Sequence, residues 1–247
     1  MRLLLDETGT HAPGEDLDEA ALSDVYAPPE GPWLRVNFVS TLDGAATGAD
    51  GRSGSINTAA DGVVFRLLRR LSDVVVVGAG TARAEGYTRL GEDDGGPLPL
   101  AVVSNSARMP EALLAPAAGR GPALLVTHAG APQEAVDGAR RALGEDAVLV
   151  CGESTVDLAA MRRELEARGL QRILAEGGPS LLGTMFAAEV VDELDLTWSP
   201  TVAGGTARRI VAGPPLDVTL APIAMVEGEG SVMGRWRVRR DVPALSS

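Results

Sequence analysis

The sequence predicts an α/β fold with a mixed, mainly parallel central sheet. Two stretches, DVVVVGAGT at 73–81 and ILAEGGPSLLG at 173–183, each combine an apolar strand, a glycine turn and a helix start. Such short apolar runs are typical of parallel strands that are buried on both faces. Strands alternate with helical patterns over most of the chain. The late strands near 223–227 and 233–239 have no helix between them, which predicts an antiparallel pair.

Composition narrows the class of protein. The chain has 247 residues, of which 45% are hydrophobic, so it can bury a sizeable core. The net charge of −12 argues against a nucleic-acid-binding surface, and no apolar run approaches the roughly 20 residues that span a bilayer. The single cysteine, Cys151, permits no internal disulfide, and the segment Met1 to Asp6 does not fit a signal peptide. We therefore expect a cytoplasmic protein that binds neither nucleic acid nor membranes.

Missing residue types restrict the chemistry. The chain has no lysine, so all 22 basic residues are arginine, and this excludes Schiff-base and P-loop lysines. Its two histidines, His11 and His128, stand in no metal-spaced cluster, which predicts that there is no metal site. The chemistry must come from carboxylates, arginines, amides, the backbone or a bound cofactor.

The first third of the chain predicts an arm, a strand, a loop and a helix. Residues 1–30 are acidic and contain three prolines, which predicts a surface arm with one short helix. Alternating residues predict a strand over 33–41. A glycine-rich loop follows Asp43 and is long enough to act as a lid. Thr58 is the expected N-cap of the next helix. Residues 31–247 are predicted to form a single domain.

The remaining elements follow the same alternation. Hydrophobic patterns predict further strands and helices, namely strands at 100–103, 123–127, 147–150 and 191–199, and helices at 132–143 and 157–168.

Three turns are candidate binding features, and each has a plain structural alternative. Glu176 ends a strand, and the segment 177–180 then opens a helix whose N-terminus suits a phosphate, although such turns often only join two elements. The turn at 78–81 is an incomplete dinucleotide fingerprint, because Arg83 stands where that motif needs a small residue. The strand end at 104–108 suits the 2′-phosphate of NADPH or an ordinary polar turn.

Taken together, the motifs resemble those of a known family. They are VNFVSTLDG, SGSINTAAD leading to LLRRLSDVVVVGAGTARAEG, VVSNSARMP, and LAEGGPSLLGTMFAAEVVDELDLTWSPTVAGG. In this order they resemble the riboflavin-biosynthesis pyrimidine reductases, which form the reductase half of the bifunctional deaminase–reductase and stand-alone relatives. The resemblance implies a dihydrofolate-reductase-like three-layer sandwich, NADPH as cofactor, a homodimer, and a stand-alone member of actinobacterial type. The deaminase motif, His-x-Glu with Pro-Cys-x-x-Cys, is absent, so no deaminase domain is expected.

The resemblance also implies roles for the positions that match the family motifs. Glu176 matches a substrate-contacting glutamate at the reaction centre. Substrate-binding roles are implied for Asn37, Ser53, Asn57 and Arg69, with Arg89 as a further candidate for the phosphate. Cofactor-binding roles fall on Ser55, Gly78, Gly80, Thr81, Glu85, Ser104, Asn105, Gly177, Gly178, Pro179, Ser180, Leu181 and Leu182. The chain departs from the family at 86–89, where Gly-Tyr-Thr-Arg replaces the usual sequence, and at Gly62, where many members have arginine.

The reaction implied by the resemblance is hydride transfer from NADPH to the ribose C1 of a ribosylamino-pyrimidine phosphate, as in a 5-amino-6-(5-phosphoribosylamino)uracil reductase. With no usable lysine or histidine, Glu176 and Asp43 are the available proton donors, and Glu176 is expected to have a raised pKa. Arg69 and Arg89 would clamp the phosphate. Three alternatives stay open: a reductase of another pteridine-like or dihydrofolate-like substrate, a Rossmann dehydrogenase, and an NADPH-binding protein without turnover. The fold also suggests an unusual, cis Gly177–Gly178 peptide.

Overall fold

The computed structural model describes residues 1–240 of the chain. The described part contains ten strands, which are β1 (Arg2–Asp6), β2 (Trp33–Thr41), β3 (Val74–Gly78), β4 (Leu100–Val103), β5 (Ala123–Thr127), β6 (Val148–Val150), β7 (Arg172–Ala175), β8 (Glu193–Ser199), β9 (Leu220–Gly228) and β10 (Ser231–Val238). Its α-helices are α1 (Glu19–Tyr26), α2 (Ala59–Arg70), α3 (Ala79–Ala84), α4 (Glu111–Leu114), α5 (Gln133–Leu143), α6 (Leu158–Ala167) and α7 (Pro179–Ala187).

All ten strands form one sheet in the order β1-β9-β10-β8-β2-β7-β3-β4-β5-β6. The strands from β8 to β6 in this order are parallel to one another. The late strands β9 and β10 pair antiparallel with each other, and β10 pairs antiparallel with β8. The predicted mixed, mainly parallel sheet is confirmed, as is the predicted antiparallel pair.

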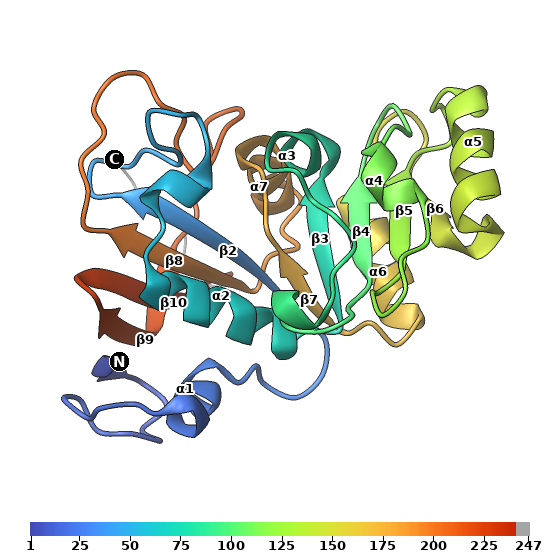
Figure 1. Ribbon diagram of the computed structural model, residues 1–247. Coiled ribbons are helices and arrows are strands. Elements are labelled where there is room, and N and C mark those ends of the chain that lie inside the picture. Colours follow the sequence, from blue (N-terminus) through green and yellow to red (C-terminus); the bar gives the residue numbers. More distant parts are fainter. Residues whose placement is uncertain (241–247) are drawn as a thin grey trace.

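Helices cover both faces of this sheet, which gives the three layers that the family resemblance implied (Figure 1). The valines of β3 show how the layers share the core, because side chains alternate along a strand. Val75 and Val77 pack with α1 and α2, whereas Val74 and Val76 pack with α6 and α7. A strand between two helix layers must be apolar on both sides, and this explains its unbroken run of valines.

The first 30 residues belong to the fold and are not the surface arm that the composition predicted. The strand β1 extends the sheet antiparallel to β9. Leu3, Leu22 and Tyr26 are almost fully buried in the core. The predicted short helix is present as α1, and it packs against α2.

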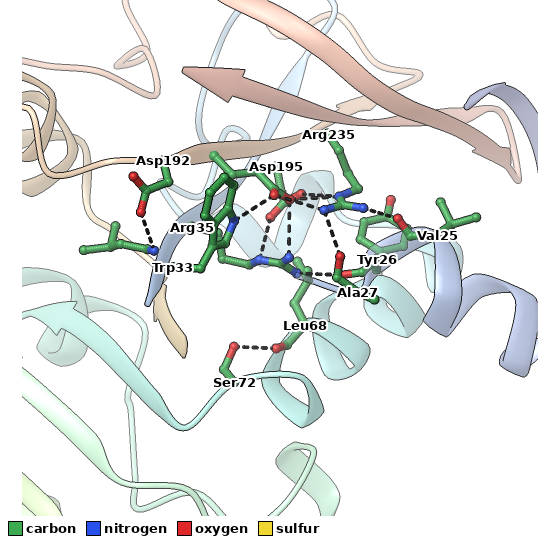
Figure 2. A network of polar contacts seen from close by, with 12 residues as sticks. Val25, Tyr26, Ala27, Trp33, Arg35, Leu68, Ser72, Asp192, Asp195 and Arg235 are labelled. Atoms are coloured by element: carbon green, nitrogen blue, oxygen red, sulfur yellow. Dashed lines mark hydrogen bonds and ion pairs between the residues drawn. The ribbon is translucent and has the colours of Figure 1, made fainter. Parts of the chain in front are cut away.

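A sealed charge cluster, made of Arg35, Glu193, Asp195 and Arg235, fastens α1 to the sheet (Figure 2). These side chains come from β2, β8 and β10, and each residue is at most 3% exposed. Arg235 donates from Nε and Nη2 to the two carboxylate oxygens of Glu193 at 2.9 and 3.0 Å. Both arginines also donate to backbone carbonyls at the end of α1. Charges buried this deeply are tolerated because each faces an opposite charge or a carbonyl.

Local signals set the starts of the helices that matter for the site. The Thr58 side chain accepts a hydrogen bond from the Asp61 N–H, so Thr58 is the N-cap of α2 as predicted. Pro179 is the first residue of α7, where its missing N–H costs nothing. Among residues 1–240, no helix is long and apolar enough to cross a membrane.

The parallel strands bring their carboxyl ends to one edge of the sheet. There β2, β7 and β3 are direct neighbours, and Figure 1 shows α3 and α7 starting from that edge. The sheet therefore gathers the segments after Thr41, Ala175 and Gly78 at one place, which is the usual position of ligand sites in such sheets.

Candidate functional site

A cavity of about 950 Å³ lies at this edge of the sheet. Its size falls within the range of small-molecule and cofactor sites. Most of the predicted site residues line it, namely Asn37, Ser53, Asn57, Arg69, Gly78, Gly80, Thr81, Glu85, Glu176, Gly178, Pro179, Ser180 and Leu181. Segments that are far apart in the sequence thus meet in one hollow.

Arg69, Tyr87 and Glu176 form a cavity charge cluster. Arg69 donates from Nε and Nη2 to the two carboxylate oxygens of Glu176 at 2.6 and 2.8 Å, and the Tyr87 hydroxyl donates to Oε2 at 2.9 Å. Arg69 and Glu176 are both less than 10% exposed. Burial alone would lower the pKa of Arg69, but the hydrogen bonds to Glu176 and its negative charge raise that pKa above the usual value.

This pairing changes two of the predicted roles. Both carboxylate oxygens of Glu176 already accept hydrogen bonds from Arg69, so the geometry does not support Glu176 as the proton donor. The pairing also occupies Nε and Nη2 of Arg69. The predicted role of Arg69, to bind the substrate phosphate, would have used these groups. Burial, followed by the charge of Glu176, raises the pKa of Tyr87 well above its usual value, so this hydroxyl keeps its proton at neutral pH.

The start of α7 forms another wall of the cavity. Its first backbone bond runs from the Leu182 N–H to the Gly178 carbonyl at 3.0 Å, so the amides of Ser180 and Leu181 precede the hydrogen-bonded turns. Free amides and the helix dipole make this wall suitable for a pyrophosphate. The Gly177–Gly178 peptide is cis, as expected.

The two predicted glycine turns pack directly on each other. The Gly78 N–H donates to the Gly177 carbonyl at 2.7 Å. A Cβ at Gly178 would collide with Oγ1 of Thr81, so a larger residue at this position would displace the Thr81 side chain. At Gly80, a Cβ would meet nothing within 4 Å, which leaves open space beside the turn. These residues fit the phosphate-bearing part of a dinucleotide, because backbone and open space face the same hollow.

Two further predicted residues are joined across the cavity. Glu85 accepts hydrogen bonds from the N–H and the hydroxyl of Ser53 at 3.2 and 3.3 Å. The short α3 helix is thereby tied to the loop before α2. Both residues line the cavity.

Asp43 lies outside the cavity, and the structure speaks against its role as a proton donor. It is exposed and braces two loops by accepting hydrogen bonds from the N–H groups of Gly204 at 2.7 Å and Ala203 at 3.1 Å. A hydrogen bond from Thr41 and these two N–H groups lower the pKa of Asp43 to about 2. At neutral pH it therefore has no proton to give.

Several other predicted residues also do not line the cavity. Arg89 is buried and does not line the cavity, and Leu182 belongs to the core. Gly177 lies in the turn before Gly178 and does not line the cavity either. Ser55 donates to the loop residue Asp50 at 2.6 Å.

At the end of β4, the structure shows a polar turn. The Ser104 hydroxyl donates to the Arg108 carbonyl at 2.7 Å, and Asn105 accepts the Val156 N–H at 2.9 Å. The turn follows Val103, which pairs with Gly78 at the end of β3.

The sequence reasoning missed several residues of the cavity, among them Asp61, Phe65, Tyr87, Asp94 and Arg208. For two of them a signal existed, since Asp61 and Phe65 precede Arg69 by eight and four positions. On a helix this spacing places all three on one face. The other three lie in loops, where no periodicity reveals which side chains turn inward.

The cavity, its helix start and its buried ion pair define an α/β protein with a site for small molecules. The model of the RibD C-terminal domain family matches residues 32–230. The chain is 30% identical over 191 residues to the 2,5-diamino-6-ribosylamino-4(3H)-pyrimidinone 5′-phosphate reductase of Methanothermobacter thermautotrophicus, covering 75% of this chain and 86% of that protein. It is 29% identical over 186 residues to the reductase of the same name from Archaeoglobus fulgidus, covering 70% and 83%.

Solved structures agree with these relatives. A crystal structure of a pyrimidine reductase-like protein from Corynebacterium diphtheriae has a TM-score of 0.75 and 26% identity, over 89% of this chain and 99% of that one. The chain belongs to the RibD C-terminal domain family. Like the relatives named as pyrimidinone phosphate reductases, it is an oxidoreductase.

Proposed function

We propose that the protein is an NADPH-dependent reductase of a ribosylamino-pyrimidine 5′-phosphate and acts on the ribose C1 carbon. The observation that carries this proposal is the cavity itself. In it, the cavity charge cluster stands beside the free amides at the start of α7. A reductase of a phosphorylated sugar amine needs both a cofactor seat and a fixed polar group at the reacting carbon.

The cofactor would lie along the two glycine turns. When bound, NADPH supplies the hydride. The amides of Ser180 and Leu181 would hold its pyrophosphate, and Thr81 and Glu85 would contact it from α3 and the residue that follows. The turn at Ser104 and Asn105 remains our candidate for the 2′-phosphate, because it follows the strand next to β3.

The cavity charge cluster would hold the substrate at its reacting end. Glu176, held in place by Arg69, would offer a carboxylate that stabilises positive charge on the amine nitrogen of the opened sugar. Tyr87 places a protonated hydroxyl beside that carboxylate. Arg69 and Arg208 are the arginines among the described residues that line the cavity, and the exposed Arg208 is our candidate for the substrate phosphate.

An assay of NADPH oxidation tests this function. Purified protein, NADPH and the pyrimidine phosphate should lose absorbance at the reduced-nicotinamide band, and dihydrofolate serves as the comparison substrate. We expect Glu176→Gln to lower kcat/KM by about 10²–10³-fold, as for the loss of one strong polar contact to a transition state. The matched control is Glu134→Gln on the exposed side of α5, which should change nothing. A wild-type protein that oxidises no NADPH with the pyrimidine phosphate would contradict the proposal.

We also propose that the protein forms a homodimer in the cytoplasm. Leu42 and Val202 are 64% and 74% exposed on neighbouring loops, since the Leu42 N–H donates to the Thr201 carbonyl at 2.9 Å. Such adjacent apolar side chains support a contact between subunits. The buried, unpaired Cys151 fits a reducing compartment. Light scattering during gel filtration tests the dimer, and a monomer at all concentrations would contradict it.

A further inference from the structure

Asp61 is a buried carboxylate of the cavity that the proposed function has not used. It is 4% exposed and lines the hollow from the first turn of α2. The other cavity carboxylates differ from it. Glu176 pairs with Arg69, Asp94 contacts two arginines, and Glu85 is half-buried.

No arginine within the described residues forms an ion pair with Asp61. Its Oδ1 accepts the hydroxyl of Thr197 on β8. Burial raises the pKa of Asp61, and hydrogen bonds from Thr197 and Asn57 offset part of this effect. A carboxylate has about four acceptor positions, so Asp61 keeps capacity for donors from a ligand. A ligand that brings donors to this buried carboxylate is favoured over one that brings an acceptor.

The position of Asp61 suits the heterocycle of the substrate. Asp61, Phe65 and Arg69 lie on one face of α2 at intervals of four residues, and all three line the cavity. Arg69 belongs to the cluster that we assign to the reacting end of the substrate. Phe65 supplies an aromatic ring between the two charged residues. Asp61 therefore lies about two helical turns from the reacting end.

The chemistry at this distance distinguishes two forms of the pyrimidine. The relatives are named for a 2,5-diamino-4(3H)-pyrimidinone, whose 2-amino group and N3–H are adjacent donors. A carboxylate can accept both donors at once, as it does from the fork of an arginine. In the 2-oxo form, which is a uracil, the group at position 2 is an acceptor and would oppose the carboxylate.

We propose that Asp61 binds the edge of the pyrimidine at positions 2 and 3 and selects the 2-amino form over the 2-oxo form. This inference rests on the proposed function. It places the reaction before any step that removes the 2-amino group, and it differs from the uracil substrate that the sequence suggested. Thr197 holds the carboxylate in position through Oδ1.

Two kinetic measurements test the selection. With NADPH, the wild-type protein should show a kcat/KM about 100-fold higher for the 2-amino than for the 2-oxo ribosylamino-pyrimidine phosphate, as expected when a buried acceptor loses its donor. Asp61→Asn replaces the carboxylate with an amide of the same shape and should reduce this ratio to about tenfold or less. Glu85→Gln, a second cavity carboxylate, should leave the ratio unchanged even if the KM for NADPH rises.

A binding measurement separates failure of this inference from failure of the proposed function. Calorimetry with 2,5,6-triaminopyrimidin-4(3H)-one and with 5,6-diaminouracil compares rings that differ only at position 2 and needs no turnover. We expect the triamino ring to bind more tightly to the wild type, and Asp61→Asn to remove the difference. If neither phosphate is reduced, the proposed function is wrong. The ring-binding result then still tests whether Asp61 selects the 2-amino ring. Equal kcat/KM for the two phosphates, or equal binding of the two rings, would overturn the inference.

Discussion

The protein contains two buried clusters of arginine and carboxylate that differ in what surrounds them. In the cavity charge cluster, Arg69 holds Glu176 at the carboxyl ends of the parallel strands, beside open space. In the sealed charge cluster, Arg235 holds Glu193 with the same bidentate geometry. The backbone carbonyl of Val25, near the end of α1, accepts a hydrogen bond from Arg235 (Figure 2). The same chemical pair can thus prepare a site or fasten an element, and its position in the sheet decides which.

The difference in surroundings determines which property of the protein each cluster supports. Nothing in the sealed charge cluster faces the cavity, so its contacts act only on the folded state. Removing one partner there leaves the remaining charges incompletely balanced and without access to water. In the cavity, water or substrate can replace a missing partner. The stability of the fold should therefore depend on the sealed charge cluster, and activity should depend on the cavity charge cluster.

The largest expected effect is on stability, in the sealed charge cluster. Arg235→Met removes the guanidinium but keeps much of the apolar stem, and it leaves Arg35 as the one arginine of the cluster that faces Glu193 and Asp195. We expect the free energy of unfolding to fall by about 3–5 kcal/mol, the usual cost of breaking a buried pair. Urea denaturation measures it. Arg70→Met, in the exposed pair with Glu19, is the control and should cost less than about 1 kcal/mol. Equal losses for the two variants would contradict the distinction between sealed and exposed pairs.

An arginine-to-methionine substitution in the cavity should reduce activity more than stability. Arg69→Met leaves Glu176 beside water and the Tyr87 hydroxyl, so we expect a loss of only about 1–2 kcal/mol in the free energy of unfolding. Its kcat/KM should fall by about 10²-fold or more, since the carboxylate that we propose for the reacting end of the substrate loses its orientation. Folded Arg235→Met protein should keep its activity. If Arg69→Met retains activity and unfolds as easily as Arg235→Met, the comparison fails.

The sealed charge cluster also contains two carboxylates that should respond to pH in opposite directions. Burial alone would raise the pKa of Glu193, but the charges of Arg35 and Arg235 lower it to about 2. Burial and the charge of Glu193 raise the pKa of Asp195 well above its usual value. The contribution of Glu193 is thus present above about pH 4 and is lost as the pH falls through about 2. The contribution of Asp195 is present below about pH 4 and is lost as the pH rises through its raised pKa.

Asp195→Asn tests this assignment, because the amide imitates the protonated acid. At neutral pH it should change the free energy of unfolding by less than about 1 kcal/mol or increase it, and its advantage over the wild type should grow from pH 5 to pH 8. Glu193→Gln should instead be strongly destabilising at neutral pH. Urea denaturation at several pH values measures both variants. A difference between Asp195→Asn and wild type that does not change with pH would contradict the assignment of the proton to Asp195.

The sequence predicted elements whose signals are local. The strand, turn and helix around Glu176 and Pro179 could be predicted because neighbouring residues carry the signal. Pairing over long distances could not. The place of β1 depends on β9, at the other end of the chain, and no pattern within Arg2–Asp6 points to it.

Side-chain partnerships in the site were harder still to predict. Arg69 and Glu176 were each predicted as site residues, but their bond spans 107 positions, and a list of residues does not say which two will meet. Asp61 was missed because an acid in the first turn of a helix is usual there and is normally solvated. Only packing against β8 shows that it is buried and turned toward the cavity.

The smallest expected effect concerns Asp43, where sequence and structure disagree. If Asp43 donated a proton, Asp43→Ala would abolish turnover and remove a limb of the pH profile of kcat. In the structure, Asp43 instead joins the loop after β2 to the loop at 203–204, and both loops continue into cavity residues such as Thr47 and Arg208.

We therefore expect Asp43→Ala to raise the KM for the pyrimidine phosphate by about two- to fivefold, while kcat and its pH profile stay as in the wild type. Asp50→Ala, which loosens the same loop without touching 203–204, is the matched control and should change KM less, because its contacts stay within its own loop. A kcat that falls with an altered pH profile would restore Asp43 to the chemistry. A change confined to KM would show that the loop brace, like the sealed charge cluster, acts by holding elements in place.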